Sequence, residues 1–325
     1  MKALVQTVPG SIDSLQVSDV PTPAPGPGQI RVKVHCCGLN PVDAKLLLDR
    51  TEMGGSAYVP GLDFAGVVDE VDPSVHGFAV GDRVSAHGAI GLATALGEYT
   101  VADAQTVAKI PDGVSFASAA ALPCAGLTAL QSIERIGVAS GDTLLVMAGG
   151  GAVGGFAVQL ASLRGARVVA TASNADKDRV TALGARRVID HHHSDIYEAV
   201  MGITGNRGVD GIIDSLSAPS ATNGLKMLAF GGQIACIGDR PDLASIPPFS
   251  TAPSIHEIAL GAAHASGDLK ARRWLRDRLG FLMDLVLCGQ LDVQITKEVP
   301  LNRAAAALKT VLGGGAHGKI VVQIG

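Results

Sequence analysis

A glycine-rich turn between an expected strand and an expected helix constrains this chain more than any other feature. An apolar run at 144–148 leads directly into Gly149-x-Gly151-x-x-Gly154, and helical spacing follows to residue 163. In dinucleotide-binding folds such glycines allow a sharp turn, close approach of the backbone to a pyrophosphate, and contact between helix and sheet. The phosphates then meet free N–H groups at the helix N-terminus. The turn therefore predicts dinucleotide contacts from Gly149, Gly151, Ala152, Val153 and Gly154.

Strands and helices are expected to alternate around this turn. The predicted strands are 143–148, 167–170, 187–189, 210–214 and 233–237, and the predicted helices are 118–136, 152–163, 177–183 and 195–201. This alternation implies a parallel sheet covered on both faces. The first 120 or so residues are punctuated by Pro and Gly and predict a β-rich region instead, with strands near 29–34, 64–71 and 82–84. A helix at 269–288 and a final strand at 319–322 are predicted near the end of the sequence.

Composition excludes several classes of partner. The chain has 325 residues, enough for two domains, and its net charge of −4 favours neither nucleic acid nor an anionic membrane. No apolar run reaches the roughly 18 residues that a membrane span needs. The five cysteines are scattered and lack the spacing of a disulfide or metal framework. We therefore expect a cytoplasmic protein with no nucleic-acid or membrane partner.

The end of the second strand after the turn bears on which cofactor binds. A ribose 2′-hydroxyl is held by an acidic residue at that position. The sequence has Thr171 and Ser173 there, followed by Lys177, and a hydroxyl with a cation suits a 2′-phosphate. Asp176 is the one residue that argues against this choice. We expect NADP(H), with contacts from Thr171, Ser173 and Lys177.

Motifs along nearly the whole chain carry a family resemblance. They include GLNPVD at 38–43, PGLDFAGVV at 60–68, GDRV at 81–84, GEY at 97–99, AALPCAGLTA at 120–129, AGGGAVGGFAVQLA at 148–161, LGA at 183–185, GGQI at 231–234 and GKIV at 318–321. In this order the chain resembles the medium-chain dehydrogenase/reductase superfamily, and within it the zinc-free quinone oxidoreductase (ζ-crystallin-like) branch.

The resemblance implies an α/β fold of two domains. A β-rich GroES-like catalytic domain is expected from residues 1–122 and 266–325, and a doubly wound Rossmann domain from 123–265. Dimers are usual in the family and often pair the edge strands of the Rossmann sheets, for which 255–263 is the candidate segment. Further cofactor contacts are implied at Thr128, His191, Ser215, Gly238 and Lys319. The run His191–His193 follows an expected strand; His191 either touches the cofactor or is solvated, as its two neighbours are expected to be.

The zinc alcohol dehydrogenases are the neighbouring branch, and the ligand positions argue against them. Their catalytic zinc has three protein ligands, commonly Cys, His and Cys or Asp. Here Asn40 stands at the first position, Leu62 and Asp63 replace a His-Glu pair, and only Cys124 matches. One soft ligand does not hold zinc, so no metal is expected.

Without a strong Lewis acid, the expected acceptor is already electrophilic: a quinone or an α,β-unsaturated carbonyl that takes hydride from NADPH. Asn40 either orients the nicotinamide or acceptor carbonyl, or caps the backbone before Pro41. Asp43 is a second catalytic candidate, with a structural role as the alternative. Tyr58 either lines the pocket or packs. Two other functions remain open: an enoyl-thioester reductase, and an NADPH-binding protein with little turnover.

Overall fold

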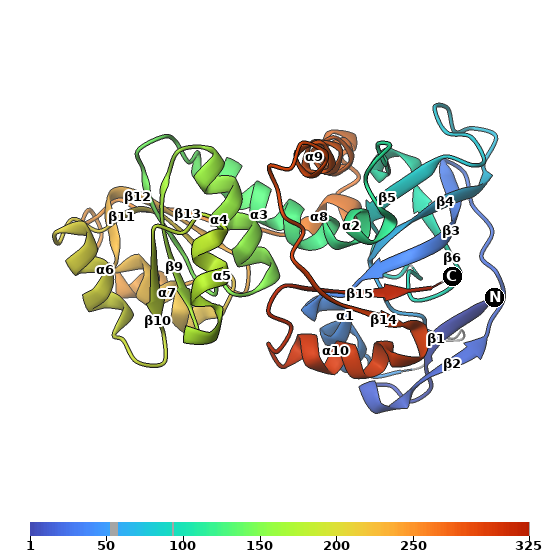
Figure 1. The fold of residues 1–325 in the computed structure, drawn as a ribbon, viewed down its shortest axis with the longest axis horizontal. Helices are drawn as coiled ribbons and strands as arrows, with labels where there is room; N and C mark the ends of the chain where they lie inside the picture. The colour runs from blue at the N-terminus through green and yellow to red at the C-terminus, as the bar shows by residue number, and fades with distance from the viewer. Residues whose placement is uncertain (53–57, 93, 325) are drawn as a thin grey trace. The chain divides into compact units, whose positions relative to one another are not determined.

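The computed structural model describes residues 1–52, 58–92 and 94–324. The chain divides into two compact units (Figure 1). Unit 1 is Met1–Leu127 with Leu260–Gly325, and unit 2 is Thr128–Ala259. The sequence placed these boundaries at 122/123 and 265/266. One division falls within helix α3 (Pro123–Ile136), which contributes residues to both units.

Unit 2 contains a parallel six-stranded sheet. Its strand order is β10 (Arg187–Asp190), β9 (Arg167–Ala172), β8 (Thr143–Val146), β11 (Val209–Asp214), β12 (Leu228–Cys236) and β13 (Ser254–Glu257). The connecting helices are α4 (Ala152–Leu163), α5 (Lys177–Ala182), α6 (Ile196–Thr204) and α7 (Ala218–Leu225). The strand order reverses between β8 and β11, and in such sheets ligands bind at the carboxyl ends of the strands at this switch point. The predicted doubly wound fold is confirmed.

Unit 1 is built on a mixed seven-stranded sheet. Along the main path its strands are β14 (Ile295–Pro300), β15 (Lys319–Gln323), β3 (Gln29–Gly38), β4 (Asp63–Val71), β5 (Arg83–His87) and β7 (Ala108–Lys109), and β6 (Tyr99–Asp103) also pairs with β3. A separate ribbon joins β1 (Lys2–Gln6) and β2 (Leu15–Asp19). The helices are α1 (Pro41–Leu48), α2 (Phe116–Ala121), α8 (Leu260–Ala265), α9 (Leu269–Leu287) and α10 (Ala304–Leu312). The 3₁₀ turns of the chain are η1 (Ile12–Ser14), η2 (Ala104–Thr106), η3 (Asn174–Asp176), η4 (Leu243–Ser245) and η5 (Leu301–Arg303).

Two expected elements differ from those observed. The helix expected at 118–136, apart from Pro123 and Gly126 near its start, is divided at Leu122 into α2 and α3, and Gly126 lies within α3. Pro123 explains the break, because proline has no backbone N–H group to donate to the carbonyl four residues earlier, although Leu122 keeps a helical backbone. The edge segment expected at 255–263 is strand only as far as Glu257, and α8 begins at Leu260.

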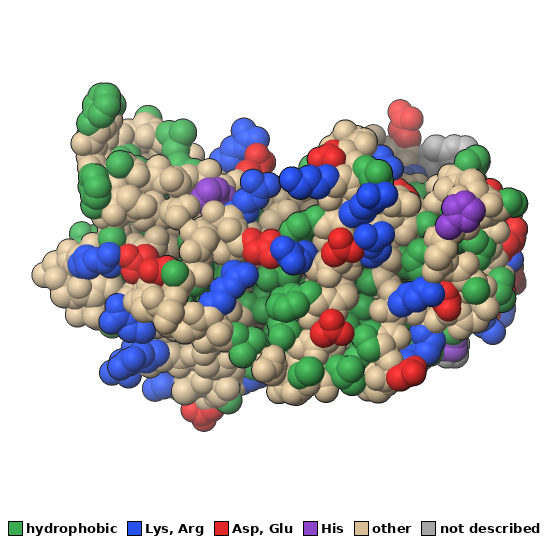
Figure 2. All heavy atoms as spheres, turned by 90° about the horizontal axis from the view of Figure 1, so that it is seen from above, with side chains coloured by type: hydrophobic (Ala, Val, Ile, Leu, Met, Phe, Trp, Pro, Cys, Tyr) green, Lys and Arg blue, Asp and Glu red, His purple; other side chains and the backbone are tan. Residues whose placement is uncertain are grey.

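Each unit has its own apolar core. In unit 2 it joins residues of several strands with α6 and α7, among them Leu145, Ile212 and Ile234. In unit 1 it joins the sheet with α1 and α10, among them Phe64, Leu47 and Leu308. In Figure 2, hydrophobic side chains protrude from the surface of unit 2, which also carries several Lys and Arg side chains. None of the described helices is long and apolar enough to cross a bilayer.

Candidate dinucleotide site and a buried polar cluster

The glycine-rich turn is held by β9. The backbone N–H of Gly149 donates to the carbonyl of Thr171 at 2.7 Å, and the N–H of Ala148 donates to the Thr171 hydroxyl at 2.9 Å. Ala148 adopts a φ of 55°, a left-handed conformation that an alanine rarely takes. Thr171, a predicted cofactor contact, thus fixes the shape of the turn with both its backbone and its side chain.

The individual glycines of the turn have different roles. A Cβ on Gly154 would lie 2.2 Å from the carbonyl oxygen of Ala148, and one on Gly149 would lie 2.8 Å from the Cβ of Ala170. A Cβ on Gly151 would meet its nearest neighbour only at 3.4 Å. Gly154 and Gly149 therefore allow close packing of helix against strand, whereas Gly151 leaves space beside the backbone.

The first turn of α4 offers hydrogen-bond donors. Gly151 is its N-cap and brings no side-chain oxygen to the N–H groups of the first turn, which include those of Ala152 and Val153. These N–H groups stand at the positive end of a 12-residue helix. Donors, dipole and space together suit the pyrophosphate of a dinucleotide.

A buried carboxylate lies beside the turn. The two oxygens of Asp176 are bound by the Ser173 hydroxyl at 2.9 Å and by the Arg179 guanidinium at 2.8 Å. Arg179 also donates to the carbonyl of Gly150. Its guanidinium thus joins α5 to the glycine turn. Lys177, the expected cation, is exposed at the start of α5.

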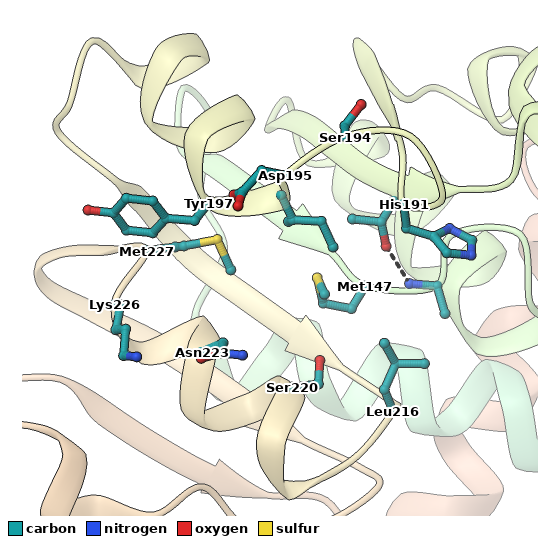
Figure 3. Close-up of a pocket in the computed structure, with 13 residues that line it drawn as sticks. Met147, His191, Ser194, Asp195, Tyr197, Leu216, Ser220, Asn223, Lys226 and Met227 are labelled. Carbon is teal, nitrogen blue, oxygen red and sulfur yellow. Dashed lines mark hydrogen bonds between the residues drawn. The ribbon is translucent and has the colours of Figure 1, made fainter.

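A cavity of about 830 Å³ opens where Ala148 and Thr171 meet at the start of the glycine-rich turn (Figure 3). At one end it is bordered by Ala148, Thr171, His191 and Leu216, which follow or end four different strands. The other end is lined by Tyr197, Asn223 and Lys226, as Figure 3 shows. The strand-end portion suits the adenosine half of a dinucleotide.

The remaining expected cofactor contacts of unit 2 lie on several elements. Thr128 is buried on α3, and Ser215 is half-buried directly after β11. Gly238 packs against the loop after β11, since a Cβ there would lie 2.7 Å from the carbonyl oxygen of Leu216. His191 is exposed and lines the cavity, and its ring lies tilted against that of His192, with 4.1 Å between the ring centroids. Their contacts with a cofactor stay predictions.

Unit 1 contains a buried polar cluster around Lys319. The Lys319 ammonium donates to the side-chain oxygen of Asn40 at 2.8 Å and to the carbonyl of Leu39 at 3.0 Å, and lies 3.6 Å from the Asp63 carboxylate. The Asn40 amide in turn donates to Asp63 at 2.8 Å. Asp63 also accepts the backbone N–H of Cys124. Lys319 and Asp63 are both fully buried, so this ion pair is shielded from water.

The Asp43 carboxylate joins two backbone segments beside this cluster, at Asn40 and at Leu62. One carboxylate oxygen accepts the N–H of Asn40 at 2.8 Å, and the other accepts the N–H of Leu62 at 3.1 Å. Burial, followed by the nearby charge of Asp63, raises the pKa of Asp43 to about 7. Tyr58 packs against the core of unit 1 with Arg50 over its ring. The contacts of Asp43 and Tyr58 are those of residues that order and pack the fold.

Two histidines meet near the cluster. His87 faces Asp63 across β4 and β5, and its Nδ1 lies 3.2 Å from Nε2 of His264 on α8. Burial lowers the pKa of His87 to about 4, with a smaller effect from the charge of Lys319. Burial also lowers the pKa of His264 to about 4. The pair is therefore held in the neutral form near pH 7.

The positions that hold catalytic zinc in related enzymes do not fit a metal here. Asn40 and Asp63 are committed to hydrogen bonds with each other, and the Lys319 ammonium places a positive charge among them. Burial raises the pKa of the Cys124 thiol well above its usual value, which disfavours the thiolate form that binds zinc. Within the described ranges, no group of three His, Cys, Asp or Glu side chains is placed to hold a metal ion.

The sequence pattern left two features unrecognised. One is the Arg179–Asp176 pair, although a spacing of three is that of side chains that meet on a helix. Lys319 was expected at the cofactor, but its ammonium is bound inside unit 1. No local signal indicates that arrangement, because Asn40 lies 279 residues away along the chain.

Comparisons with known proteins agree with this architecture. Residues 26–112 match the alcohol dehydrogenase GroES-like domain, and 152–266 match the family described as zinc-binding dehydrogenase. The quinone oxidoreductase of Mus musculus is 29% identical over 94% of this chain and 92% of its own length. The phthioceranic/hydroxyphthioceranic acid synthase of Mycobacterium tuberculosis is 32% identical over the whole chain, which spans 15% of that protein.

Solved structures share the whole fold. A crystal structure of an NAD-dependent alcohol dehydrogenase superimposes with a TM-score of 0.85 at 31% identity, covering 100% of both chains. A mycobacterial protein complexed with NADPH superimposes with a TM-score of 0.84 at 28% identity, covering 99% of this chain and 100% of that one. With its GroES-like unit and pyridine-nucleotide-binding unit, the chain belongs to the medium-chain dehydrogenase/reductase superfamily of oxidoreductases, in its quinone oxidoreductase branch.

Proposed function

We propose that this protein uses NADPH to deliver hydride to a quinone or an α,β-unsaturated carbonyl, without zinc. The observation that carries this proposal is the buried Lys319–Asp63–Asn40 cluster, in which an ammonium and an amide occupy the surroundings where related dehydrogenases coordinate a metal. An alcohol is a poor hydride donor unless its oxygen is polarised. A quinone or enone is already electrophilic and needs mainly position and a dry site.

Bound NADPH would supply the hydride, and the residues of unit 2 would hold it. The N–H groups of Ala152 and Val153 and the dipole of α4 support binding of the pyrophosphate. The strand-end portion of the large cavity, at Thr171, His191 and Leu216, would take the adenosine.

The choice of NADP over NAD rests on charge at the end of β9. Both oxygens of Asp176 already accept hydrogen bonds, from Ser173 and Arg179, and so are poorly placed to hold a ribose hydroxyl. Arg179 offsets the charge of Asp176, and Lys177 adds an exposed cation near this strand end, where a 2′-phosphate would bring negative charge. The mycobacterial relative complexed with NADPH supports the same choice.

The test is a turnover assay with the full chain. NADPH is mixed with a panel of quinones and enones, and its oxidation is followed by nicotinamide absorbance. We expect consumption of NADPH with at least one acceptor class, purified protein without stoichiometric zinc, and activity that chelators do not lower. Tight NADPH binding without oxidation of any acceptor would contradict the enzyme proposal and favour a binding protein with little turnover.

A second candidate function is reduction of an enoyl thioester. The specific observation in its favour is the 32% identity with a mycobacterial acid synthase, of which this chain spans 15%. Including an enoyl thioester and its free unsaturated acid in the same panel separates the two functions. Turnover restricted to the thioester would favour this second candidate over the quinone and enone reductase.

We further propose a cytoplasmic homodimer that pairs through the exposed edge strand β13, since β13 is the last strand of its sheet and adjoins only β12. All five cysteines are free thiols, which suits a reducing compartment. Light scattering of the purified protein tests the dimer, and a proline at Ile255 should weaken it because proline removes a strand N–H group.

A further inference from the structure

A second cavity in unit 2 lies at the opposite edge of the sheet from the glycine-rich turn. It encloses about 400 Å³ and is lined where β8, β9 and β10 begin, where α6 ends, and by the loop before β11. Four of its lining residues are arginines, and we call it the arginine pocket. They are Arg167, Arg186, Arg187 and Arg207.

The topology of the sheet brings these arginines together. Parallel strands all begin at the same edge, so residues that open neighbouring strands are neighbours in space. Arg167 is the first residue of β9 and pairs in register with Thr143, the first residue of β8. Arg187 is the first residue of β10, and Arg207 lies in the turn between α6 and β11. Segments distant in sequence thus contribute arginines to the lining of one cavity.

The pocket carries an excess of positive charge. Arg207 pairs with Asp210 at 2.6 Å, and the other oxygen of that carboxylate accepts the N–H of Thr143. Arg167 donates to the carbonyl of Gly141 at 2.8 Å, and its charge helps to lower the pKa of Asp210, so this carboxylate faces two of the four arginines. Asp142 lies close enough to raise the pKa of Arg207 further, as a smaller effect than Asp210. Among the ion pairs of the described residues, none involves Arg167, Arg186 or Arg187.

We propose that the arginine pocket binds a compact oligophosphate. Guanidinium groups bind phosphate oxygens through paired N–H donors, which suits arginine better than lysine for this ligand. The apolar lining is limited to short side chains of Val168, Val169 and Ile203, and no lining residue is aromatic. A nucleobase would therefore find no ring to stack on, so the phosphate chain itself carries recognition.

The experiment titrates the full chain with sodium tripolyphosphate by isothermal calorimetry at low ionic strength. The test variant is Arg186→Ala with Arg187→Ala, since both side chains are exposed and neither pairs with a carboxylate. The matched control is Lys297→Ala with Arg303→Ala, which removes two exposed cations from unit 1. We expect saturable binding of one tripolyphosphate per chain, weakened about tenfold or more in the test variant and less than about twofold in the control.

Two further titrations separate this pocket from the cofactor site. Saturating NADPH should leave tripolyphosphate binding in place, and NADPH affinity should be unchanged in the test variant, because the glycine-rich turn lies at the other edge of the sheet. ATP should bind no more tightly than tripolyphosphate. The proposal is overturned by non-saturable binding, by equal losses in test and control variants, by displacement with NADPH, or by binding of ATP alone. None of these results bears on turnover of NADPH with quinones or enones.

Discussion

The two units achieve precise geometry by opposite means. Unit 2 builds its candidate cofactor site from backbone: a strand end, three glycines and the first turn of α4, held by Thr171. Unit 1 builds its cluster from buried charged and polar side chains, with Lys319 in contact with Asn40 and Asp63. The turn in unit 2 tolerates a substitution only where there is space for a Cβ. The cluster in unit 1 is stable only if each buried polar atom has a hydrogen-bond or ionic partner. Substitutions should therefore damage the units through different physical effects.

The largest expected effect comes from removing the cation of the cluster. Lys319→Met would leave the fully buried Asp63 carboxylate without its partner, and breaking a buried pair costs about 3–5 kcal/mol. Urea unfolding followed by circular dichroism measures the change. Adding Asp63→Asn should recover part of the loss, because the unpaired charge is then gone. A loss below about 1 kcal/mol for Lys319→Met would show that the pair contributes little to unit 1.

The next prediction concerns acid stability through the neutral histidines of unit 1. The pKa of His87 is lowered to about 4. Between pH 6.5 and 4 this side chain is therefore protonated in the unfolded chain but neutral in the folded chain. Stability should therefore fall as the pH drops from 6.5 to 4, by up to about 3 kcal/mol from His87 alone. His87→Gln should remove this slope while leaving stability above pH 7 nearly unchanged.

Asp43 acts in the opposite direction over the whole of the same range. Its pKa is raised to about 7, so protonation of the folded chain adds stability as the pH falls below 7. Both proteins retain Asp43 and His264, so the difference between their unfolding curves reports His87 together with its effect on the pKa of His264. Parallel curves for the two proteins between pH 6.5 and 4 would contradict a neutral His87.

A smaller effect separates two glycines of unit 2. Gly154→Ala would force a Cβ to within 2.2 Å of the Ala148 carbonyl oxygen, and we expect a loss of about 1–3 kcal/mol in stability. Gly151→Ala should leave stability within about 1 kcal/mol, since its nearest neighbour is 3.4 Å away, but it should weaken NADPH binding by filling the space beside the pyrophosphate. Thermal unfolding and fluorescence titration with NADPH measure the two quantities. If Gly154→Ala and Gly151→Ala lowered stability equally, the glycines could not be divided into one that packs and one that leaves space for the cofactor.

The smallest predicted effect concerns the choice of cofactor. Ser173→Asp with Lys177→Ala should weaken NADPH binding about tenfold and change NADH binding little, because only NADPH carries the 2′-phosphate. Fluorescence titration of both cofactors gives the ratio, and Lys226→Ala, which removes one positive charge elsewhere along the cavity, is the control for the Lys177→Ala half of the variant. An equal loss for both cofactors would refute the proposed 2′-phosphate site.

Local sequence predicted unit 2 better than unit 1, for a physical reason. The helix at 152–163 and the strand before the turn follow from periodicity and glycine spacing over about twenty residues, and both were confirmed. Helix α1 was missed although Pro41 at its first position and Asp43 at its third are recognised start signals. The bonds of Lys319 join residues hundreds apart in sequence, so no local pattern reveals them.

The position of β15 in its sheet has a consequence for synthesis on the ribosome. β15 pairs with β3, and Lys319 binds Asn40, which the ribosome makes 279 residues earlier. All of unit 2 is translated between these two segments, and domains commonly fold as soon as their chain is complete. The nascent chain should therefore hold a finished nucleotide-binding unit while the sheet of the other unit still lacks β15. During that interval the exposed edge of β3 is a site where chaperones, or another nascent copy, can bind.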